Sequence, residues 1–329
     1  MTTARTVPVT TEMDGDELDA QDAWRTARAV GLGRLLVDSF VRFRFGDGFT
    51  NSRALALQAA LAVVPFLLAM TGLAADIDED RPARVVARTI QAVSPGAGAN
   101  DALAGAVSGD VSSQEAGELA LGFGLAFALL SMTTAMAQTE RGLNRIYGIR
   151  RDRRAVAKYA RAAVMTAVMT AVLAGPLGLG FLLLVAGSPF ADAMRADYGW
   201  SDSTALFFNV GRWPLGLLLL VVAIAVMLDH APRRRQPTLS WLALGSGIAV
   251  TLAMVATTLL AVYVHVGDSF GNVYGPLGGM FALLLWSLLS SMAFFYGAAV
   301  CAQLEACRAG VPDPAYPDPG RPSNKQVSD

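Results

Sequence analysis

The sequence predicts an all-α protein, a polytopic integral membrane bundle of about six transmembrane helices with both termini in the cytoplasm. Hydrophobic residues make up 53% of its 329 residues and charged residues only 16%, whereas a soluble domain carries roughly 25% charged residues. The charges are also segregated, because residues 1–53 are polar whereas residues 269–304 contain no ionised side chain. Alternating spans and loops produce this pattern, so lipid is the predicted main solvent of the chain.

The predicted spans follow from the thickness of the bilayer. A hydrocarbon core of about 30 Å needs about 20 apolar residues in a helix, because lipid offers no partner to unpaired backbone groups. Six stretches meet this requirement: Ala54–Leu73, Leu119–Ala137, Ala162–Ala186, Ala205–Leu228, Trp241–Val264 and Pro276–Val300. The fourth contains Arg212, which we expect at the outer interface beside Trp213, where its guanidinium can reach the lipid headgroups.

The basic residues orient this arrangement. Most of the 26 Lys and Arg residues fall on one side of it, including those in residues 1–53, residues 138–161 and the run Arg233–Arg235. Lys and Arg accumulate in cytoplasmic loops, so this side is predicted to be cytoplasmic. Omitting the fourth span would place Arg233–Arg235 outside, which favours keeping that span.

The transmembrane domain is predicted to occupy residues 24–308, between two disordered cytoplasmic tails. Residues 1–23 are acidic and lack the basic start and apolar core of a signal peptide, and residues 309–329 are rich in Pro and Asp. Residues 24–45 mix apolar and Arg side chains, which suits an interfacial helix on the anionic inner leaflet, although a packed or solvated helix fits nearly as well. Residues 76–118 are predicted to form an external helical cap.

The sequence offers no constellation for catalysis or metal binding. Cys301 and Cys307 face different sides of a helix, so we expect no disulfide between them. His230 and His265 fall on opposite sides of the membrane and cannot form one metal centre. Paired carboxylates and an activated serine are absent from the spans. We therefore predict no enzyme, no metal and no cofactor, and the net charge of −1 gives no indication of a nucleic-acid partner.

Two residues of the first span suggest special roles. Gln58 lies about one turn inside the span, where its amide needs several hydrogen-bond partners. Pro65 releases a backbone carbonyl from the helix, which either shapes a cavity or simply kinks the helix. The Ser and Thr residues of the spans are interpreted as helix–helix contacts.

Glycines crowd the turn between the fifth and sixth spans. Gly275 and Gly278 permit positive φ and close backbone approach, while Tyr263 and Tyr274 suit the outer interface. A tightly turned or re-entrant segment here would line a cavity open to the outer leaflet. An ordinary short loop followed by a tightly packed helix fits the same residues nearly as well.

Four stretches of the chain form one recognisable pattern. They are Asn51–Leu73, with Arg53 opening the run through Gln58 to Pro65; Gln138–Arg154, with Tyr147 before a basic cluster; Arg212–Trp213–Pro214 followed by Pro232–Arg235; and Tyr263 followed by Asn272–Gly278 and Leu283–Trp286. Over roughly residues 40–308 this pattern resembles the YihY/BrkB family of bacterial inner-membrane proteins. Asp229–His230 and Ala302–Glu305 depart from the family's usual residues at those places.

The resemblance implies six transmembrane helices, a place in the bacterial inner membrane and a role in cell-envelope integrity, with lipid transport or flipping suspected. It also implies that an older label for such proteins, ribonuclease BN, is a misassignment. Membrane lipids and envelope-biogenesis proteins are the implied partners.

Our leading hypothesis is a bundle that binds or translocates a lipid or another amphipathic envelope component, through the Tyr263–Gly279 region, the outer cap and Gln58. A non-catalytic scaffold that recruits envelope-synthesis enzymes through basic inner loops is an alternative from another class, and a membrane-bound hydrolase or nuclease is a third. The candidate lipid-contact or structural residues are Arg53, Gln58, Pro65, Arg212, Tyr263, Tyr274, Gly275, Gly278 and Trp286.

Overall fold

The structure is a computed structural model, which describes residues 5–13, 18–75, 114–149, 160, 163–164, 180, 182–266 and 278–317. Its elements are strand β1 (Arg5–Thr6), helices α1 (Ala20–Val30), α2 (Leu32–Phe45), α3 (Gly48–Ala75) and α6 (Gln114–Ile146), the π-helix η2 (Leu182–Ala186), helices α9 (Gly187–Tyr198), α10 (Asp202–His230), α11 (Leu239–Val266) and α13 (Gly278–Arg308), and strand β2 (Tyr316–Pro317). The predicted all-α class is confirmed, since helices make up nearly all of the described chain.

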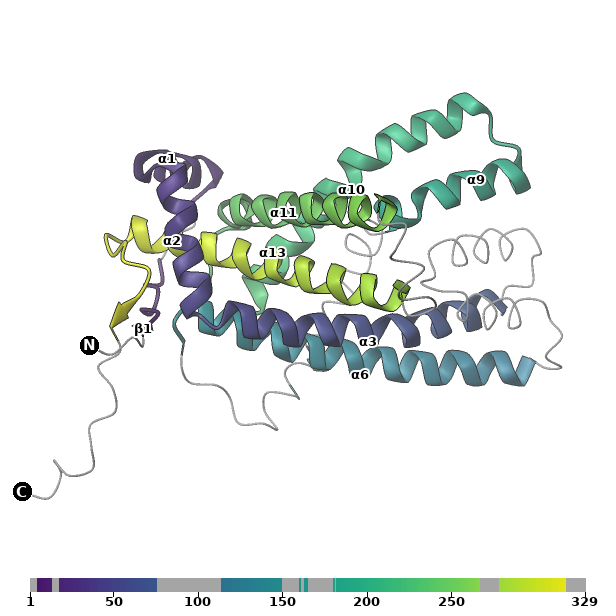
Figure 1. Cartoon of the computed structure of the whole chain (residues 1–329), viewed down its shortest axis with the longest axis horizontal. Coiled ribbons are helices and arrows are strands. Elements are labelled where there is room, and N and C mark those ends of the chain that lie inside the picture. The colour runs from purple at the N-terminus through teal and green to yellow at the C-terminus, as the bar shows by residue number, and fades with distance from the viewer. Residues whose placement is uncertain are drawn as a thin grey trace, which may run out of the picture.

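Long helices form a bundle along the long axis of the molecule (Figure 1). Helix α13 packs against α3 on one side and α11 on the other, while α6 packs along α3 and α10 along α11. Helices α1 and α2 and strand β1 gather at one end (Figure 1), which we call the basal end. The start of α11, the end of α13 and residues 316–317 lie at that same end.

Three helices of the described chain, α10, α11 and α13, are long and apolar enough to cross a membrane. They contain the predicted fourth and fifth spans and nearly all of the sixth, and α3 and α6 contain the first two. Most of the third predicted span, Ala162–Ala186, lies outside the described residues. Large apolar side chains such as Leu206, Phe207 and Val210 on α10 are exposed, as lipid-facing residues must be.

The predicted interfacial helix over residues 24–45 is in fact two helices. Gly31 separates α1 from α2 with a φ of +90°, which glycine adopts readily because it has no Cβ. Helix α2 buries Leu35, Ser39 and Phe43 and packs against α13 and α3. One face of α2 thus packs on the bundle, while Leu32, Val37 and Phe40 on the helix are exposed, so its place on the inner leaflet stays a prediction.

The two segments predicted as disordered tails are partly ordered, which differs from our expectation. Arg5–Thr6 pairs antiparallel with Tyr316–Pro317, and Val7 and Thr10 are buried. These segments are polar on average, but their few apolar and hydroxyl side chains find partners at the basal end. Residues 1–4, 14–17 and 318–329 lie outside the described residues, as does nearly all of the predicted outer cap.

Candidate functional site

A groove lies between α11 and α13, in the half of the bundle away from the basal end. Its volume is about 360 Å³, and it is lined by Ala256, Leu259, Leu260, Tyr263, Leu285 and Leu289. Apart from the Tyr263 hydroxyl, these lining side chains are apolar. Tyr263 is 58% exposed, so the groove is open to the surroundings of the bundle at this residue.

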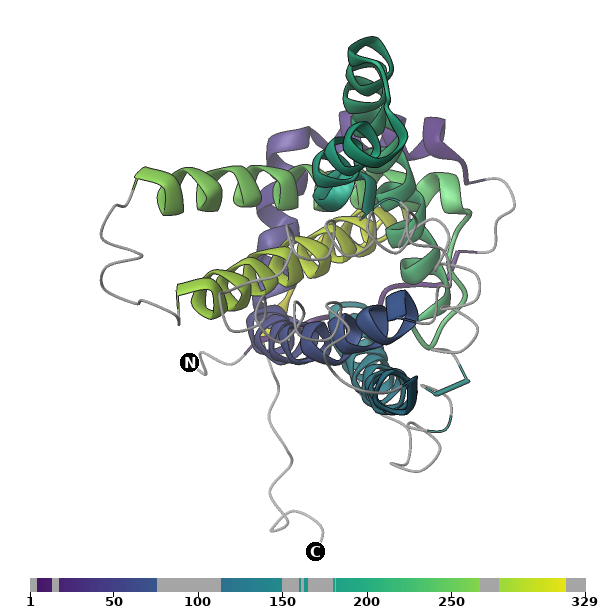
Figure 2. The same ribbon diagram turned by 90° about the vertical axis from the view of Figure 1, so that its right-hand side faces the viewer.

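Two helix contacts set the shape of this groove. At its side, Trp286 Nε1 on α13 donates a hydrogen bond to Thr257 Oγ1 on α11 at 3.0 Å. Nearer the basal end, Gly245 and Gly297 let the two backbones touch, since a Cβ built on Gly245 would lie 2.5 Å from the Gly297 oxygen. From that contact the helices separate toward their Val266 and Gly278 ends (Figure 2), so glycine contact at one end opens the groove at the other.

The predicted candidates from the fifth and sixth spans have different places in the structure. Tyr263 lines the groove and Trp286 links the helices beside it. Gly278 is buried at the start of α13. Tyr274 and Gly275 lie outside the described residues, and the predicted tight turn lies there too.

The candidates of the first span contribute to the contact between α3 and α6. Thr134 Oγ1 donates to Gln58 Oε1 at 2.8 Å, and about two turns nearer the basal end Gln138 Nε2 donates to Asn51 Oδ1 at 2.8 Å. Gln58 is thereby a helix–helix contact. Arg53 is exposed, and α3 continues through Pro65 to Ala75.

Contrary to our expectation, the Arg212 side chain does not reach outward. It is only 9% exposed, its Nη1 donates to the Leu183 oxygen at 3.0 Å, and its Nη2 donates to Ser188 Oγ at 2.6 Å. Leu183 belongs to η2, and a backbone carbonyl has two lone pairs, so it can accept from a side-chain donor as well as from the helix. Gly187 makes room for this approach, because a Cβ there would lie 2.6 Å from Arg212 Nη1. Arg212 thus ties α10 to η2 and α9.

A second polar site lies at the basal end, and we call its residues Arg42, Tyr147, Arg234, Gln303 and Glu305 the basal cluster. Arg234 Nη2 forms a salt bridge of 2.7 Å with Glu305 Oε2, and the two side chains are 2% and 0% exposed. The Arg234 guanidinium lies 4.7 Å from the ring centre of Tyr147. Arg42 Nε donates to Gln303 Oε1 at 3.1 Å. Helix α2, the ends of α6 and α13, and the segment after α10 meet here.

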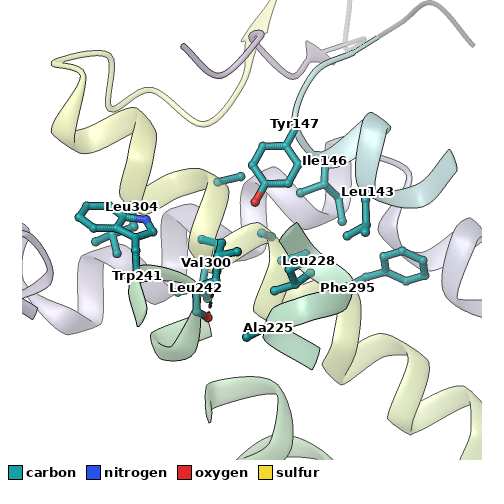
Figure 3. Close-up of a cluster of buried hydrophobic side chains, with 14 of the residues drawn as sticks. Leu143, Ile146, Tyr147, Ala225, Leu228, Trp241, Leu242, Phe295, Val300 and Leu304 are labelled. Carbon is teal, nitrogen blue, oxygen red and sulfur yellow. Dashed lines mark hydrogen bonds between the residues drawn. The ribbon is translucent and has the colours of Figure 1, made fainter. Parts of the chain in front are cut away.

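The basal cluster carries two cations against one carboxylate. Burial lowers the pKa of Arg42 to about 10, with Tyr147 and Glu305 acting in the opposite direction, so the guanidinium stays protonated at neutral pH. Burial also raises the pKa of Tyr147 well above its usual value, so its hydroxyl stays neutral. The cluster rests on a layer of apolar side chains from α6, α10, α11 and α13, including Leu143, Leu228 and Phe295 (Figure 3).

Sequence reasoning did not find this cluster. The resemblance drew attention to Tyr147, Arg234 and Glu305 in separate stretches, but nothing in the sequence joined them into one site. Arg42 and Gln303 are 261 positions apart, so no local spacing connects them. The one available signal was Glu305, the first charged residue after a long run without charge.

The two thiols adjoin the basal cluster, since Gln303 Nε2 donates a hydrogen bond to Cys307 Sγ at 3.7 Å. Cys301 and Cys307 are free thiols, as the sequence predicted. His230 Nδ1 lies 3.0 Å from Asp229 Oδ2 and 3.1 Å from the Val226 oxygen, and the side chain of His265 lies outside the described residues. Within the described ranges, no group of three His, Cys, Asp or Glu residues is arranged to hold a metal ion.

A helical bundle with apolar helices long enough to cross a bilayer defines an integral membrane protein. The chain belongs to the family described as Virulence factor BrkB, whose family model matches residues 39–321. The matched region includes the groove and the whole basal cluster. The predicted resemblance is therefore confirmed.

Individual relatives are distant. The chain is 24% identical over 278 residues to a ribonuclease-like protein of Bacillus subtilis, YfkH, and the match covers 84% of this chain and 97% of that protein. It is 26% identical over 186 residues to UPF0761 membrane proteins of Pseudomonas paraeruginosa and Pseudomonas aeruginosa. These matches cover 56% of this chain and 42% of each relative, less than half of their length. No solved structure matches the chain.

Proposed function

We propose that this protein is a non-enzymatic protein of the bacterial inner membrane that binds an amphipathic lipid of the cell envelope, with an acyl chain lying in the groove between α11 and α13. The groove carries the proposal because its lining is apolar and it is open at Tyr263. Tyrosine suits the membrane interface, where its ring is apolar and its hydroxyl meets polar groups. A lipid in the groove would present its polar part near Tyr263.

Selectivity in such a groove comes from fit. Lipid tails are about as apolar as leucine, so an acyl chain gains little hydrophobic free energy when it leaves the bilayer for the groove. Close packing and a hydrogen bond near the headgroup must then supply the preference. The contacts Trp286–Thr257 and Gly245–Gly297 support this proposal, since they hold the two walls of the groove at a fixed separation.

We extend the same proposal in three ways. The protein translocates the lipid, contributes to envelope integrity and has both termini in the cytoplasm. The scaffold alternative relies on basic inner loops, and Arg233 and Arg235 are indeed exposed. Arg234 between them is occupied by Glu305, so the run offers two recruiting cations rather than three. The name of the Bacillus relative suggests nuclease activity, which a degradation assay on single-stranded RNA can test in parallel.

A groove-filling variant tests the proposal. We expect mass spectrometry of lipids co-purified with the wild-type protein to find one lipid class enriched over the bulk membrane. Ala256→Phe, which fills the groove, should abolish that enrichment. Val255→Phe is the matched control, because Val255 neighbours Ala256 but is 52% exposed outside the groove. Bulk lipid composition in the wild type, or equal enrichment in both variants, would contradict the proposal.

A further inference from the structure

The N-terminal segment covers the basal cluster. Residues 5–13, which we call the strap, contact both of its arginines. Arg42 Nη1 donates to Thr10 Oγ1 at 2.6 Å, and Arg234 Nη2 donates to the Thr11 carbonyl at 3.3 Å. The strap is further held by the Thr10 amide, which donates to the Tyr147 carbonyl at 3.0 Å. Neutral oxygens of the strap are thus partners of two buried cations.

The hydrogen-bond and ion-pair partners of the two arginines include one carboxylate. Glu305 pairs with Arg234, and the partners of Arg42 at Gln303, Thr10 and Ile146 are all neutral. Glu12 of the strap also acts electrostatically on Glu305, and this carboxylate leaves with the strap. Burying an uncompensated charge is strongly unfavourable. In addition, Arg42 Nη2 and Arg234 Nη1 are buried without a hydrogen-bond partner among the residues that the structure describes. Both arginines therefore keep a donor available for an additional acceptor.

We propose that the basal cluster is a binding site for a phosphate-bearing anion, and that the strap closes it by placing the Thr10 and Thr11 oxygens where oxygens of the anion bind. Guanidinium groups suit phosphate because their planar donors pair with two of its oxygens at once. One bound anionic charge would also balance the excess cation. Glu305 orients Arg234 in this arrangement. The site is distinct from the groove and does not depend on the function proposed for it.

Few backbone pairs join the strap to β2. Its β-ladder with β2 comprises only two residue pairs, Arg5 with Pro317 and Thr6 with Tyr316. The strap also makes a close backbone contact with Gly148, which has a φ of +78°. A Cβ at this position would overlap the Pro8 carbonyl and lie 2.7 Å from the Val9 amide nitrogen. A single methyl group at position 148 therefore displaces the strap without touching either arginine.

The test uses the full-length protein in phosphatidylcholine nanodiscs and measures the thermal unfolding midpoint during titration with inorganic phosphate. We expect Gly148→Ala to be stabilised at phosphate concentrations at least tenfold below those that the wild type needs, because a ligand that binds the folded state raises its stability. Gly199→Ala controls for backbone strain, since Gly199 has a φ of +67° and nothing within 4 Å of its Cβ position. It should respond like the wild type.

A second variant, Thr10→Ala, opens the site without backbone strain, and Thr11→Ala is its control. Thr10→Ala removes the hydroxyl that occupies Arg42, whereas Thr11→Ala leaves the carbonyl that Arg234 uses. We expect a phosphate response from Thr10→Ala and a wild-type response from Thr11→Ala. Adding Arg42→Gln to Gly148→Ala should abolish the response, and chloride at equal ionic strength should not reproduce it.

Parallel nanodiscs containing phosphatidic acid, without added phosphate, separate the two sources of the phosphate group. Stabilisation of Gly148→Ala by inorganic phosphate assigns the site to a free phosphate compound. Stabilisation by phosphatidic acid alone assigns it to a lipid headgroup. A response to neither probe in both Gly148→Ala and Thr10→Ala overturns the site, and equal responses in the wild type and Gly148→Ala overturn the closing role of the strap.

Discussion

Helix α13 has two different surroundings along its length. From Gly297 to Ala306 its residues are all buried, whereas between Met280 and Leu289 most are partly or fully exposed. The buried end holds a charged residue, Glu305, and the open end borders the apolar groove. A helix enclosed by protein on all sides can hold a carboxylate because it meets a paired cation there. A helix facing lipid presents apolar side chains, and so is suited to bind an apolar chain.

The largest expected effect is at the buried end. Glu305→Ala leaves Arg234 buried without its charged partner, and we expect a loss of roughly 3–5 kcal/mol in the free energy of unfolding. Titration with a denaturing detergent, followed by circular dichroism, measures this loss. Ser290→Ala, at a partly exposed position of the same helix, is the control and should change stability by less than about 0.5 kcal/mol. Equal effects would mean that the two ends do not differ as described.

A smaller effect is expected where α11 and α13 touch. Gly245→Val introduces side-chain atoms against the Gly297 oxygen and Cys301, and overpacking of this kind costs roughly 1–3 kcal/mol. Gly247→Val makes the same change one half-turn away, where nothing lies within 4 Å of the Cβ position. Thermal unfolding of the two variants should therefore differ, and similar midpoints would show that this contact does not limit the helix separation.

The link beside the groove should matter less for stability. Trp286→Phe removes the hydrogen bond to Thr257, and hydrogen bonds between membrane helices average roughly 0.6 kcal/mol with a maximum of about 1.7. We expect a decrease in that range, together with a changed profile of co-purified lipids because the groove walls are no longer tied. An unchanged lipid profile would show that the Trp286 hydrogen bond does not affect lipid binding in the groove.

The smallest stability effect is expected at Tyr263. Its side chain is mainly exposed, and surface substitutions usually change stability by less than about 0.5 kcal/mol. Tyr263→Phe should therefore unfold like the wild type. If the hydroxyl contacts the polar part of a lipid, the same variant will retain less of the enriched lipid class, which lipid mass spectrometry can quantify. If Tyr263→Phe retains as much of this lipid class as the wild type, the Tyr263 hydroxyl does not contact the lipid, and the ring only lines the groove.

The sequence predicted the long helices of the described chain and named two residues at the groove. Apolar runs of sufficient length identified α10, α11 and α13, because a span needs only length and hydrophobicity. Tyr263 and Trp286 were named because they belong to a stretch that carries the family resemblance, and because Tyr suits the outer interface. Arg212 was assigned outward because hydrophobicity does not reveal that a π-helix offers it a carbonyl. The basal cluster was missed because its residues meet only after the whole chain has folded.

That last feature has a consequence for biosynthesis. Gln303 lies 261 positions after Arg42, so Gln303, Glu305 and Tyr316 are synthesised long after Arg42. Until then Arg42 and Arg234 lack these partners, and β1 has no strand to pair with. The basal end can therefore form only after the ribosome has passed Tyr316. A chain truncated before Glu305 would expose unpaired arginines and an unpaired strand edge, which are features that quality-control proteases can distinguish from the finished protein.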